Sequence, residues 1–368
     1  MMELFQQMVS MGHERVVVCS NPEVGLRGII AVHNTVLGPG LGGVRMWPYE
    51  NFDEALWDVL RLSRGMTYKA AASGVNLGGA KAVIIGDSKT DKTEELLRSF
   101  GRYVDSLGGL YITAEDVGMR MKDMEVILGE TRWVTGVSEA HGGSGDPSPV
   151  TAFGVLQGIR AAARWKYGDR KLTGRRVAIQ GLGSVGRYLA EGLLKEGASV
   201  VGCDVDEDAV EKGRELGIEI VEPDAIVDAE CDIFSPCALG ASINPQTIPR
   251  LKCGIVAGGA NNQLDDEERD GRALSERGIL YAPDFVINAG GLINVYNELN
   301  GYNRERALRM ARHVYDNVWR IFEVADEQNV PTHLAANHVA EERIQRMKGL
   351  GSRQWSRFTG GRGVHIHT

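Results

Sequence analysis

RVAIQGLGSVGRYLAEGLLKEGASVVGCD, residues 176–204, carries the clearest structural signal in the chain. A β-branched run, Arg176–Gln180, leads into a glycine-rich turn, and a helical stretch follows at Val185–Glu196. The next run, Ser199–Cys203, again favours a strand and is followed by Asp204. A strand, a glycine turn, a helix and a second strand in this order predict a βαβ unit of a parallel sheet.

The glycines of this stretch match the GxGxxG fingerprint of dinucleotide-binding loops at Gly181, Gly183 and Gly186. Glycine there permits a tight turn and a close approach of the backbone to a pyrophosphate, which the helix N-terminus stabilises. Asp204 would accept hydrogen bonds from the adenosine ribose and would repel a 2′-phosphate, so the sequence predicts NAD in preference to NADP. Ser184 and Val185 complete the predicted cofactor loop. The alternative is a glycine turn that binds no nucleotide.

The composition is that of a globular protein with two or three domain-sized units. The 368 residues are 43% hydrophobic and 24% charged, and the 47 glycines follow no Gly-X-Y period. A net charge of −8 argues against a nucleic-acid partner. Neither a membrane-spanning run nor a secretory signal is visible, so no membrane partner is expected. The five cysteines form no CxxC pair, which predicts reduced thiols, no metal site and a cytoplasmic location.

Two rounds of alternating strands and helices predict two α/β domains with a cleft between them. The first domain is expected over residues 1–140, with residues 329–352 packing back onto it, as the domain for substrate binding and oligomerisation. The second, residues 145–328, is expected to be a doubly wound Rossmann-type domain that binds NAD. Residues 353–368 are rich in Gly, Arg and Ser and are expected to form a mobile tail.

The remaining elements are predicted from hydrophobic periodicity and turn residues. Strands are expected at Arg15–Cys19, Leu26–His33, Lys81–Ile85, Leu110–Thr113, Trp133–Val137, Ile218–Val221, Asp232–Ser235, Gly254–Ala257, Ile279–Ala282 and Phe285–Asn288, and helices at Asp53–Met66, Thr93–Ser106, Thr151–Arg164 and Arg304–Glu327.

A second chemical signal lies in residues 65–81, GMTYKAAASGVNLGGAK. Lys69 and Lys81 flank a run of small residues, where long cationic side chains are hard to explain as packing. Two lysines that converge on a cleft would bind a carboxylate, and burial and mutual repulsion would lower their pKa values toward those of a general base. Asp116, in ITAEDVG, follows a strand, a position suited to functional carboxylates. Solvated surface lysines and a helix N-cap at Asp116 are the structural alternatives.

These motifs resemble those of the glutamate, leucine, phenylalanine and valine dehydrogenases, and those of the leucine-specific members most. The resemblance covers about residues 2–346 and rests on GGVRMWPY, the helix and loop that contain MTYK and LGGAK, YITAEDVG, GGSGDPSP, GLGSVG, CDIFSPCALGA, ANNQL, YAPDFVINAGG and GYNRERA. These motifs are long and stand in the order of the family, which makes a pair of surface lysines a poor explanation.

The resemblance implies a role for each matching residue. Lys69 would hold the substrate α-carboxylate together with the backbone of Gly42 and Gly43. Lys81 would activate the attacking water, and Asp116 would bind the amino group and relay its proton. The implied reaction is the reversible, NAD-dependent deamination of an L-amino acid to a 2-oxo acid and ammonia, faster at alkaline pH. Other residues implied to line the substrate and the nicotinamide are Met66, Thr151, Asn262 and Asn288.

The side chain of the substrate is predicted to be aliphatic. Glutamate-specific relatives carry Lys at the position of Leu41 and Ser at that of Val295, so a buried glutamate carboxylate would have no partner here. Leu41, Ala114, Leu292 and Val295 suit leucine, isoleucine or valine instead. Leu292 is larger than the valine usual in leucine enzymes, which argues against aromatic substrates.

Two other readings stay open. One is a phenylalanine, tryptophan or broad-range amino-acid dehydrogenase. The other is a catalytically silent nucleotide-binding scaffold, which would be expected to lose Lys69, Lys81 or Asp116, all present here. The resemblance also implies a homo-oligomer, either an octamer or a dimer, built on the first domain.

Overall fold

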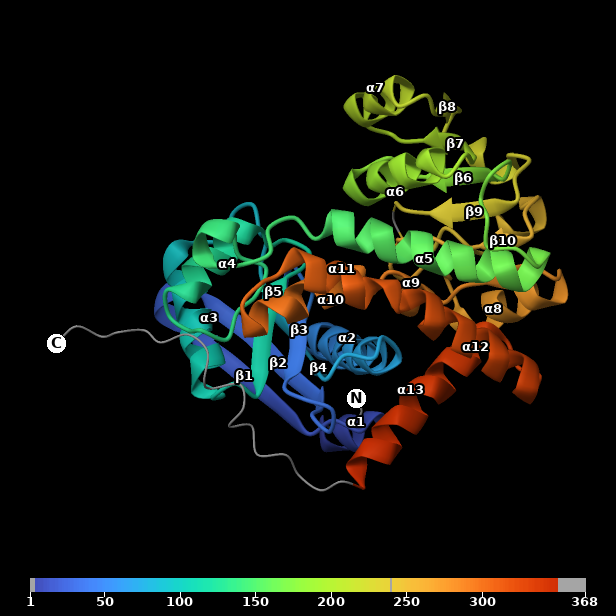
Figure 1. Cartoon of the computed structure of the whole chain (residues 1–368). Coiled ribbons are helices and arrows are strands. Elements are labelled where there is room, and N and C mark those ends of the chain that lie inside the picture. The colour runs from blue at the N-terminus through green and yellow to red at the C-terminus, as the bar shows by residue number, and fades with distance from the viewer. Residues whose placement is uncertain (1–3, 239, 350–368) are drawn as a thin grey trace. The chain divides into compact units, whose positions relative to one another are not determined.

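The computed structural model describes residues 4–238 and 240–349, and it forms two compact α/β units (Figure 1). Of the described residues, unit 1 contains 4–146, Val295–Asn303 and 340–349. Unit 2 consists of Pro147–Asn294 and Arg304–Val339. The chain thus returns to unit 1 twice after leaving it, and the tail expected to be mobile lies outside the described residues.

Unit 1 is built on a five-stranded sheet of order β1-β2-β4-β3-β5. The elements of the unit are α1 (Leu4–Met11), β1 (Arg15–Asn21), η1 (Pro22–Val24), β2 (Leu26–Asn34), β3 (Gly40–Trp47), α2 (Phe52–Ala72), β4 (Gly78–Ile85), α3 (Glu94–Ser106), β5 (Tyr111–Glu115), α4 (Met121–Leu128), η2 (Glu139–His141) and η5 (Asn297–Asn300). β3 is parallel to both neighbours, whereas β2 is antiparallel to β1 and β4. The sheet is therefore mixed, because the short η1 turn joins β1 and β2 as a hairpin.

Helix α2 packs closely on β4 because the strand carries glycine where the helix crosses it. A Cβ at Gly79 would lie 2.1 Å from the Thr67 backbone nitrogen, which only glycine avoids. The helix begins at the Asn51 cap, whose side chain accepts a hydrogen bond from the Glu54 amide, and it continues beyond the predicted end at Met66. The apolar core between α2 and the sheet consists of Ile29, Ala31, Tyr49, Ala55, Leu56, Val59, Leu60 and Val83.

Unit 2 contains a six-stranded parallel sheet of order β11-β10-β9-β6-β7-β8. Its elements are α5 (Ser148–Tyr167), β6 (Arg176–Gln180), α6 (Ser184–Lys195), β7 (Ser199–Cys203), α7 (Glu207–Glu215), β8 (Glu219–Ile220), η3 (Ile226–Asp228), β9 (Ile233–Pro236), η4 (Ile248–Arg250), β10 (Ile255–Val256), α8 (Glu267–Glu276), β11 (Leu280–Tyr281), α9 (Asp284–Ile287), α11 (Arg304–Arg312) and α12 (Val314–Gln328). Two helices, α10 (Gly290–Tyr296) and α13 (Thr332–Lys348), belong partly to each unit. The doubly wound arrangement predicted for this part of the chain is confirmed.

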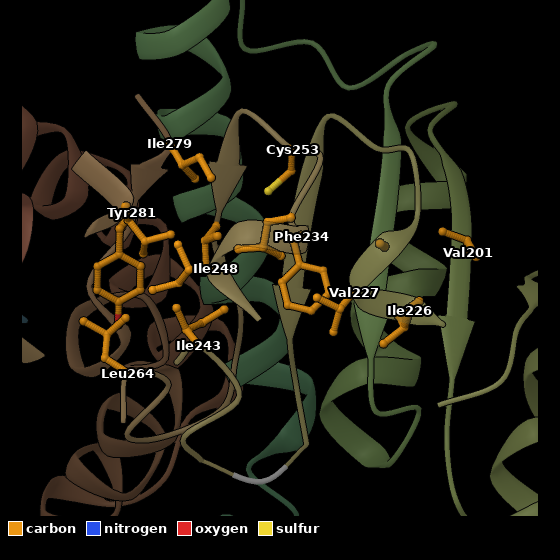
Figure 2. Packing of buried hydrophobic residues seen from close by; sticks show 14 of the residues in the cluster. Val201, Ile226, Val227, Phe234, Ile243, Ile248, Cys253, Leu264, Ile279 and Tyr281 are labelled. Carbon is orange, nitrogen blue, oxygen red and sulfur yellow. The ribbon is translucent and has the colours of Figure 1, made fainter. Parts of the chain in front are cut away.

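The core of unit 2 gathers around Phe234 on β9. Figure 2 shows this ring between Ile248 on one side and Val227 on the other, with Tyr281 further along the same layer. All four side chains are at least nine-tenths buried. The cluster includes Ala178 of β6 and Phe234 of β9. These two strands are parallel, so their carboxyl ends meet at the edge of the sheet from which the loops of a nucleotide site would extend.

Several predicted elements differ from those observed. Phe285–Asn288 was predicted as a strand, but it lies in helix α9, which starts after Pro283. The helix expected over Arg304–Glu327 is divided at His313 into α11 and α12. Trp133–Val137 contributes only an isolated bridge, from Val134 to Thr113. Among the residues that the structure describes, no helix is long and apolar enough to cross a membrane.

Candidate active site

A buried ion pair joins Lys81 on β4 to Asp116, which directly follows β5. The Lys81 ammonium bonds Oδ2 of Asp116, and Oδ1 of the same carboxylate accepts a hydrogen bond from Arg45 Nε over 2.9 Å. Arg45 lies on β3, between the strands that supply the other two residues. Three neighbouring strands thus bring two cations to a single carboxylate. Lys81 is 4% exposed, while the Asp116 side chain keeps 20% of its surface open.

The sequence did not indicate that Arg45 belongs to this group. Its Nη1 atom donates to Asp58 Oδ2 on α2 over 2.9 Å, so the guanidinium bridges two carboxylates. Asp58 also accepts a hydrogen bond of 2.6 Å from the Tyr49 hydroxyl and pairs with Arg61 Nη2 at 2.7 Å. The motif GGVRMWPY, which contains both Arg45 and Tyr49, is the signal that could have found them.

The electrostatics of the pair suit proton transfer. Burial lowers the pKa of Lys81, and the nearby Arg45 lowers it further, whereas Asp116 opposes the shift. Burial alone would raise the pKa of Asp116, but Lys81 and Arg45 outweigh it and bring the value to about 2. At neutral pH Asp116 is therefore ionised, and Lys81 releases its proton more readily than a free lysine does.

Gly42 and Gly43 on β3 face a backbone so close that no side chain fits. A Cβ at Gly42 would lie 1.7 Å from the Ala80 carbonyl oxygen, and one at Gly43 would lie 2.5 Å from the Glu115 carbonyl oxygen. Their neighbours on the sheet include two predicted pocket residues, Leu41 at 2% and Ala114 at 9% exposure. Because the backbones approach so closely at Gly42 and Gly43, the groups present at this point of the sheet are main-chain groups and small side chains.

The remaining predicted substrate residues of unit 1 lie on two helices. A Cβ at Gly42 would come within 3.3 Å of Met66 Cγ, so this α2 side chain lies against β3. Lys69 follows one turn later on α2 and is half-buried. Val295 is half-buried on α10, and Leu292, buried one turn earlier on that helix, belongs to unit 2.

The surroundings of the three glycines in the loop of unit 2 suit a bound dinucleotide. Gly181 has φ +99°, and a Cβ at Gly186 would lie 2.0 Å from the Gly181 carbonyl oxygen, so the fold itself requires both. Gly183 has an ordinary φ of −61°, and a Cβ there would meet no atom of the described chain within 4 Å. Gly183 is the N-cap of α6 and has no side chain that could cap the helix. A glycine that the fold does not need, at a helix N-terminus, leaves room for a pyrophosphate.

Asp204 lies at the end of β7 and binds the same loop. Its Oδ2 accepts a hydrogen bond from the Leu182 amide over 2.6 Å, and its Oδ1 accepts one from the Asp206 amide over 3.0 Å. A carboxylate offers about four acceptor sites, so two remain for ribose hydroxyls. The position and the remaining capacity both suit the predicted contact.

Two amide residues of unit 2 are arranged differently from each other. Asn288 is buried and donates from Nδ2 over 2.6 Å to Oδ1 of Asn261, which belongs to the motif ANNQL. Asn262 is exposed and holds a left-handed φ of 49°, which asparagine tolerates better than most residues. Thr151 lies in the first turn of α5 and donates its hydroxyl to the Pro147 carbonyl over 3.0 Å.

In residues 4–238 and 240–349, no group of three or more His, Cys, Asp or Glu side chains could hold a metal ion.

A parallel doubly wound unit with a dinucleotide loop and a mixed α/β unit with a buried lysine–aspartate pair define the class of two-domain dehydrogenases. Residues 13–133 match the dimerisation domain of the Glu/Leu/Phe/Val dehydrogenases, and residues 142–221 and 205–350 match the glutamate/leucine/phenylalanine/valine dehydrogenase family. The chain belongs to this family. It is an amino-acid dehydrogenase that acts on CH–NH₂ groups and uses a nicotinamide cofactor.

The similarity to individual proteins extends over nearly the whole chain. The leucine dehydrogenase of Thermoactinomyces intermedius is 54% identical over 94% of this chain and 95% of that protein. The phenylalanine dehydrogenase of Caldalkalibacillus thermarum (strain TA2.A1) is 49% identical over 92% and 93%. The crystal structure of L-tryptophan dehydrogenase from Nostoc punctiforme is similar with a TM-score of 0.85 and 45% identity, covering 94% of this chain and 99% of that chain.

Proposed function

We propose that the protein catalyses the reversible oxidative deamination of branched-chain L-amino acids, leucine first, to 2-oxo acids and ammonia. The observation that carries the chemistry is the buried Lys81 with its ionised partner Asp116, because deamination needs a neutral base beside an anionic site for an ammonium group. The similarity to leucine dehydrogenases is higher than that to the phenylalanine enzyme, which favours an aliphatic substrate.

Each residue of unit 1 has a distinct task in this reaction. Lys69 and the backbone at Gly42 and Gly43 hold the substrate carboxylate. Asp116 accepts hydrogen bonds from the amino group and relays its proton. Lys81, in its neutral form, removes a proton from the water that attacks Cα after oxidation, and the protonated form stabilises the resulting oxyanion.

The cofactor is proposed to be NAD. When bound, NAD would supply the acceptor for the hydride that leaves Cα of the amino acid, and the overall reaction would consume one water and yield the 2-oxo acid, ammonia, NADH and a proton. The loop around Gly183 would hold the pyrophosphate, and Asp204 would bind the ribose hydroxyls and disfavour a 2′-phosphate. Thr151, Asn262 and Asn288 are proposed to lie beside the nicotinamide.

The cofactor preference is tested at Asp204. The Asp204→Ala variant should lose more affinity for NADH than for NADPH, as measured by quenching of protein fluorescence. An unchanged ratio of the two affinities would remove the ribose contact from the proposal. Glu211→Ala, an exposed acidic residue on α7, serves as the matched control.

The substrate preference rests on the apolar residues Leu41, Ala114, Leu292 and Val295. None of them can pair with a side-chain carboxylate, and the volume of Leu292 limits the space for a large ring. The decisive experiment is NADH formation at alkaline pH with leucine, isoleucine, valine, phenylalanine, tryptophan and glutamate in turn. The proposal requires that the branched aliphatics lead and that glutamate is inert. An aromatic substrate in the lead would overturn the preference while leaving the chemistry in place.

The family match to a dimerisation domain supports self-association through unit 1. We propose a homo-oligomer in the cytoplasm, with an octamer as the expected state and a dimer as the alternative. Trp47 and Trp57 of unit 1 are 49% and 53% exposed in the single chain, which suits a surface that a second copy covers. Light scattering coupled to gel filtration gives the subunit number. The five cysteines, none of them in a disulfide, suit a reducing compartment.

A further inference from the structure

Asp116 is held at both of its oxygens, which is more than an ion pair with Lys81 requires. Lys81 binds Oδ2, whereas Arg45 Nε reaches Oδ1 from the neighbouring strand at 2.9 Å. A carboxylate bonded at one oxygen can still turn about its χ2 torsion. The second bond fixes the plane of the carboxylate and therefore the direction in which its remaining acceptor sites point.

Arg45 is itself bound by a second carboxylate, that of Asp58. Its Nη1 atom donates to Asp58 on α2, and Asp58 is bound in turn by the Tyr49 hydroxyl and by Arg61. The exposed fraction of the side chain is 20% for Arg45, as it is for Asp116, and 11% for Asp58, so the bridge is largely buried. A guanidinium can bridge two carboxylates in this way because its donors form a rigid planar fork, which an ammonium lacks.

We propose that Arg45 is a positioning residue for the deamination reaction, which aims the Asp116 carboxylate at the substrate amino group and is itself aligned by Asp58. This inference rests on the proposed function. It assigns Arg45 and Asp58 a task in the reaction although neither bonds Lys81.

The two positioning residues have opposite electrostatic effects on the base. Arg45 lowers the pKa of Lys81, whereas Asp58 raises it. The charged groups that act on Lys81 are Asp116, Arg45 and Asp58. The elements around it also carry Arg27 and His33 on β2, Asp53, Glu54, Arg61, Arg64, Tyr68 and Lys69 on α2, Tyr111 and Glu115 on β5, and Tyr49 after β3. Loss of Arg45 should therefore move the alkaline rise of activity to higher pH, and neutralisation of Asp58 should move it to lower pH. A purely structural role would not produce shifts of opposite sign.

The test compares Arg45→Gln, Arg45→Lys and Asp58→Asn with the wild type, using leucine and NAD across alkaline pH. For Arg45→Gln we expect kcat to fall about 100-fold, because a small misplacement of a reacting group has this effect. KM should change by less than about threefold, because binding of the substrate carboxylate is intact. Arg45→Lys should keep the wild-type position of the pH profile but lose about tenfold in kcat, since it cannot bridge both carboxylates. Asp58→Asn keeps an oxygen acceptor for Arg45, so its main effect should be to move the alkaline rise of activity to lower pH.

Arg98→Gln is the matched control, because Arg98 on α3 also bridges two carboxylates, Glu94 and Glu130, away from this site. It should behave as the wild type. If Arg45→Gln fails to fold by circular dichroism, the other two variants decide the matter: the inference requires a wild-type pH profile with about tenfold lower kcat in Arg45→Lys and a profile moved to lower pH in Asp58→Asn.

Two results overturn the inference alone: an active wild type with an equally active Arg45→Gln, or profile shifts of the same sign in Arg45→Gln and Asp58→Asn. A wild type that oxidises none of the amino acids overturns the proposed function and this inference with it.

Discussion

His13 and His33 stand edge to face in unit 1, with ring centroids 4.8 Å apart and an interplanar angle of 77°. His33 donates from Nε2 to the Met11 carbonyl over 2.9 Å, and its Nδ1 lies 2.8 Å from the Thr67 hydroxyl. Nε2 of His13 lies 2.8 Å from the Ser63 hydroxyl. The two imidazoles therefore join the end of α1 and strand β2 to the interior face of α2.

This pair predicts an acid-sensitive fold. Burial lowers the pKa of both His13 and His33 to about 4, below the value of 6.5 expected for the unfolded chain. The unfolded state then binds more protons between these values, so the free energy of unfolding falls as pH falls from about 6.5 toward 4. The urea midpoint should decrease over this range. In a His33→Gln variant the midpoint should be lower at pH 7.5 but depend less on pH. An equally steep dependence in the variant would contradict this origin.

Substitution of the buried lysine should separate chemistry from cofactor binding. Lys81→Ala is expected to reduce kcat by about 10³-fold or more, since it removes both the base and the partner of Asp116. NADH binding, measured by fluorescence titration, should stay within about twofold because the glycine loop belongs to unit 2. Lys89→Ala, at an exposed position after β4, is the control. Near-normal turnover in Lys81→Ala would remove this residue from its assigned role.

The protonation of Lys81 should respond to the charge on Asp116. The carboxylate raises the pKa of Lys81, so Asp116→Asn should lower it further and move the alkaline rise of kcat to lower pH. The height of the plateau should fall at the same time by about 10²–10⁴-fold, because an amide cannot relay the amino proton. The pH profile of kcat with leucine is the measurement. A rise that moves to higher pH would show that the pair does not act as described.

Two glycines of one loop should give opposite phenotypes. Gly186→Ala forces a Cβ to within 2.0 Å of the Gly181 carbonyl oxygen and should destabilise unit 2 by about 1–3 kcal/mol. Gly183→Ala meets no atom of the described chain, so its melting temperature should be unchanged while its affinity for NADH falls about tenfold or more. Calorimetry and fluorescence titration of both variants check the pair. A Gly183→Ala variant with normal affinity would mean that no ligand approaches this point.

The sequence predicted elements well where local pattern and tertiary environment agree. β6 and β7 have the predicted bounds because β-branched runs enclosed by turn residues leave little choice. Strand β3 was missed because three of its eight residues are glycines, which usually indicate a loop. In this protein those glycines allow β3 to pack against the neighbouring backbone. Phe285–Asn288 shows the opposite error, since a short apolar run does not distinguish a strand from a buried helix.

The candidate site could be foreseen only in part for a related reason. Lys81 and Asp116 were recognised from motifs, and the structure places them in contact. Asp58 could not be linked to them, because an aspartate in the middle of an amphipathic helix usually faces solvent. Its partner Arg45 is 71 residues from Asp116 in the sequence, and only the order of the strands brings them together.

The carboxylate of Asp204 also bears on how this enzyme could evolve. The side chain proposed to select the cofactor is also the one that fastens the glycine loop through the Leu182 amide. A variant that binds a phosphorylated cofactor would have to lose the negative charge of Asp204 and also replace its hydrogen bond to the Leu182 amide. A single replacement would loosen the loop for either dinucleotide before it favoured the new one. Exchange of the cofactor therefore requires at least two substitutions, one that removes the negative charge and one that restores the hydrogen bond to the loop.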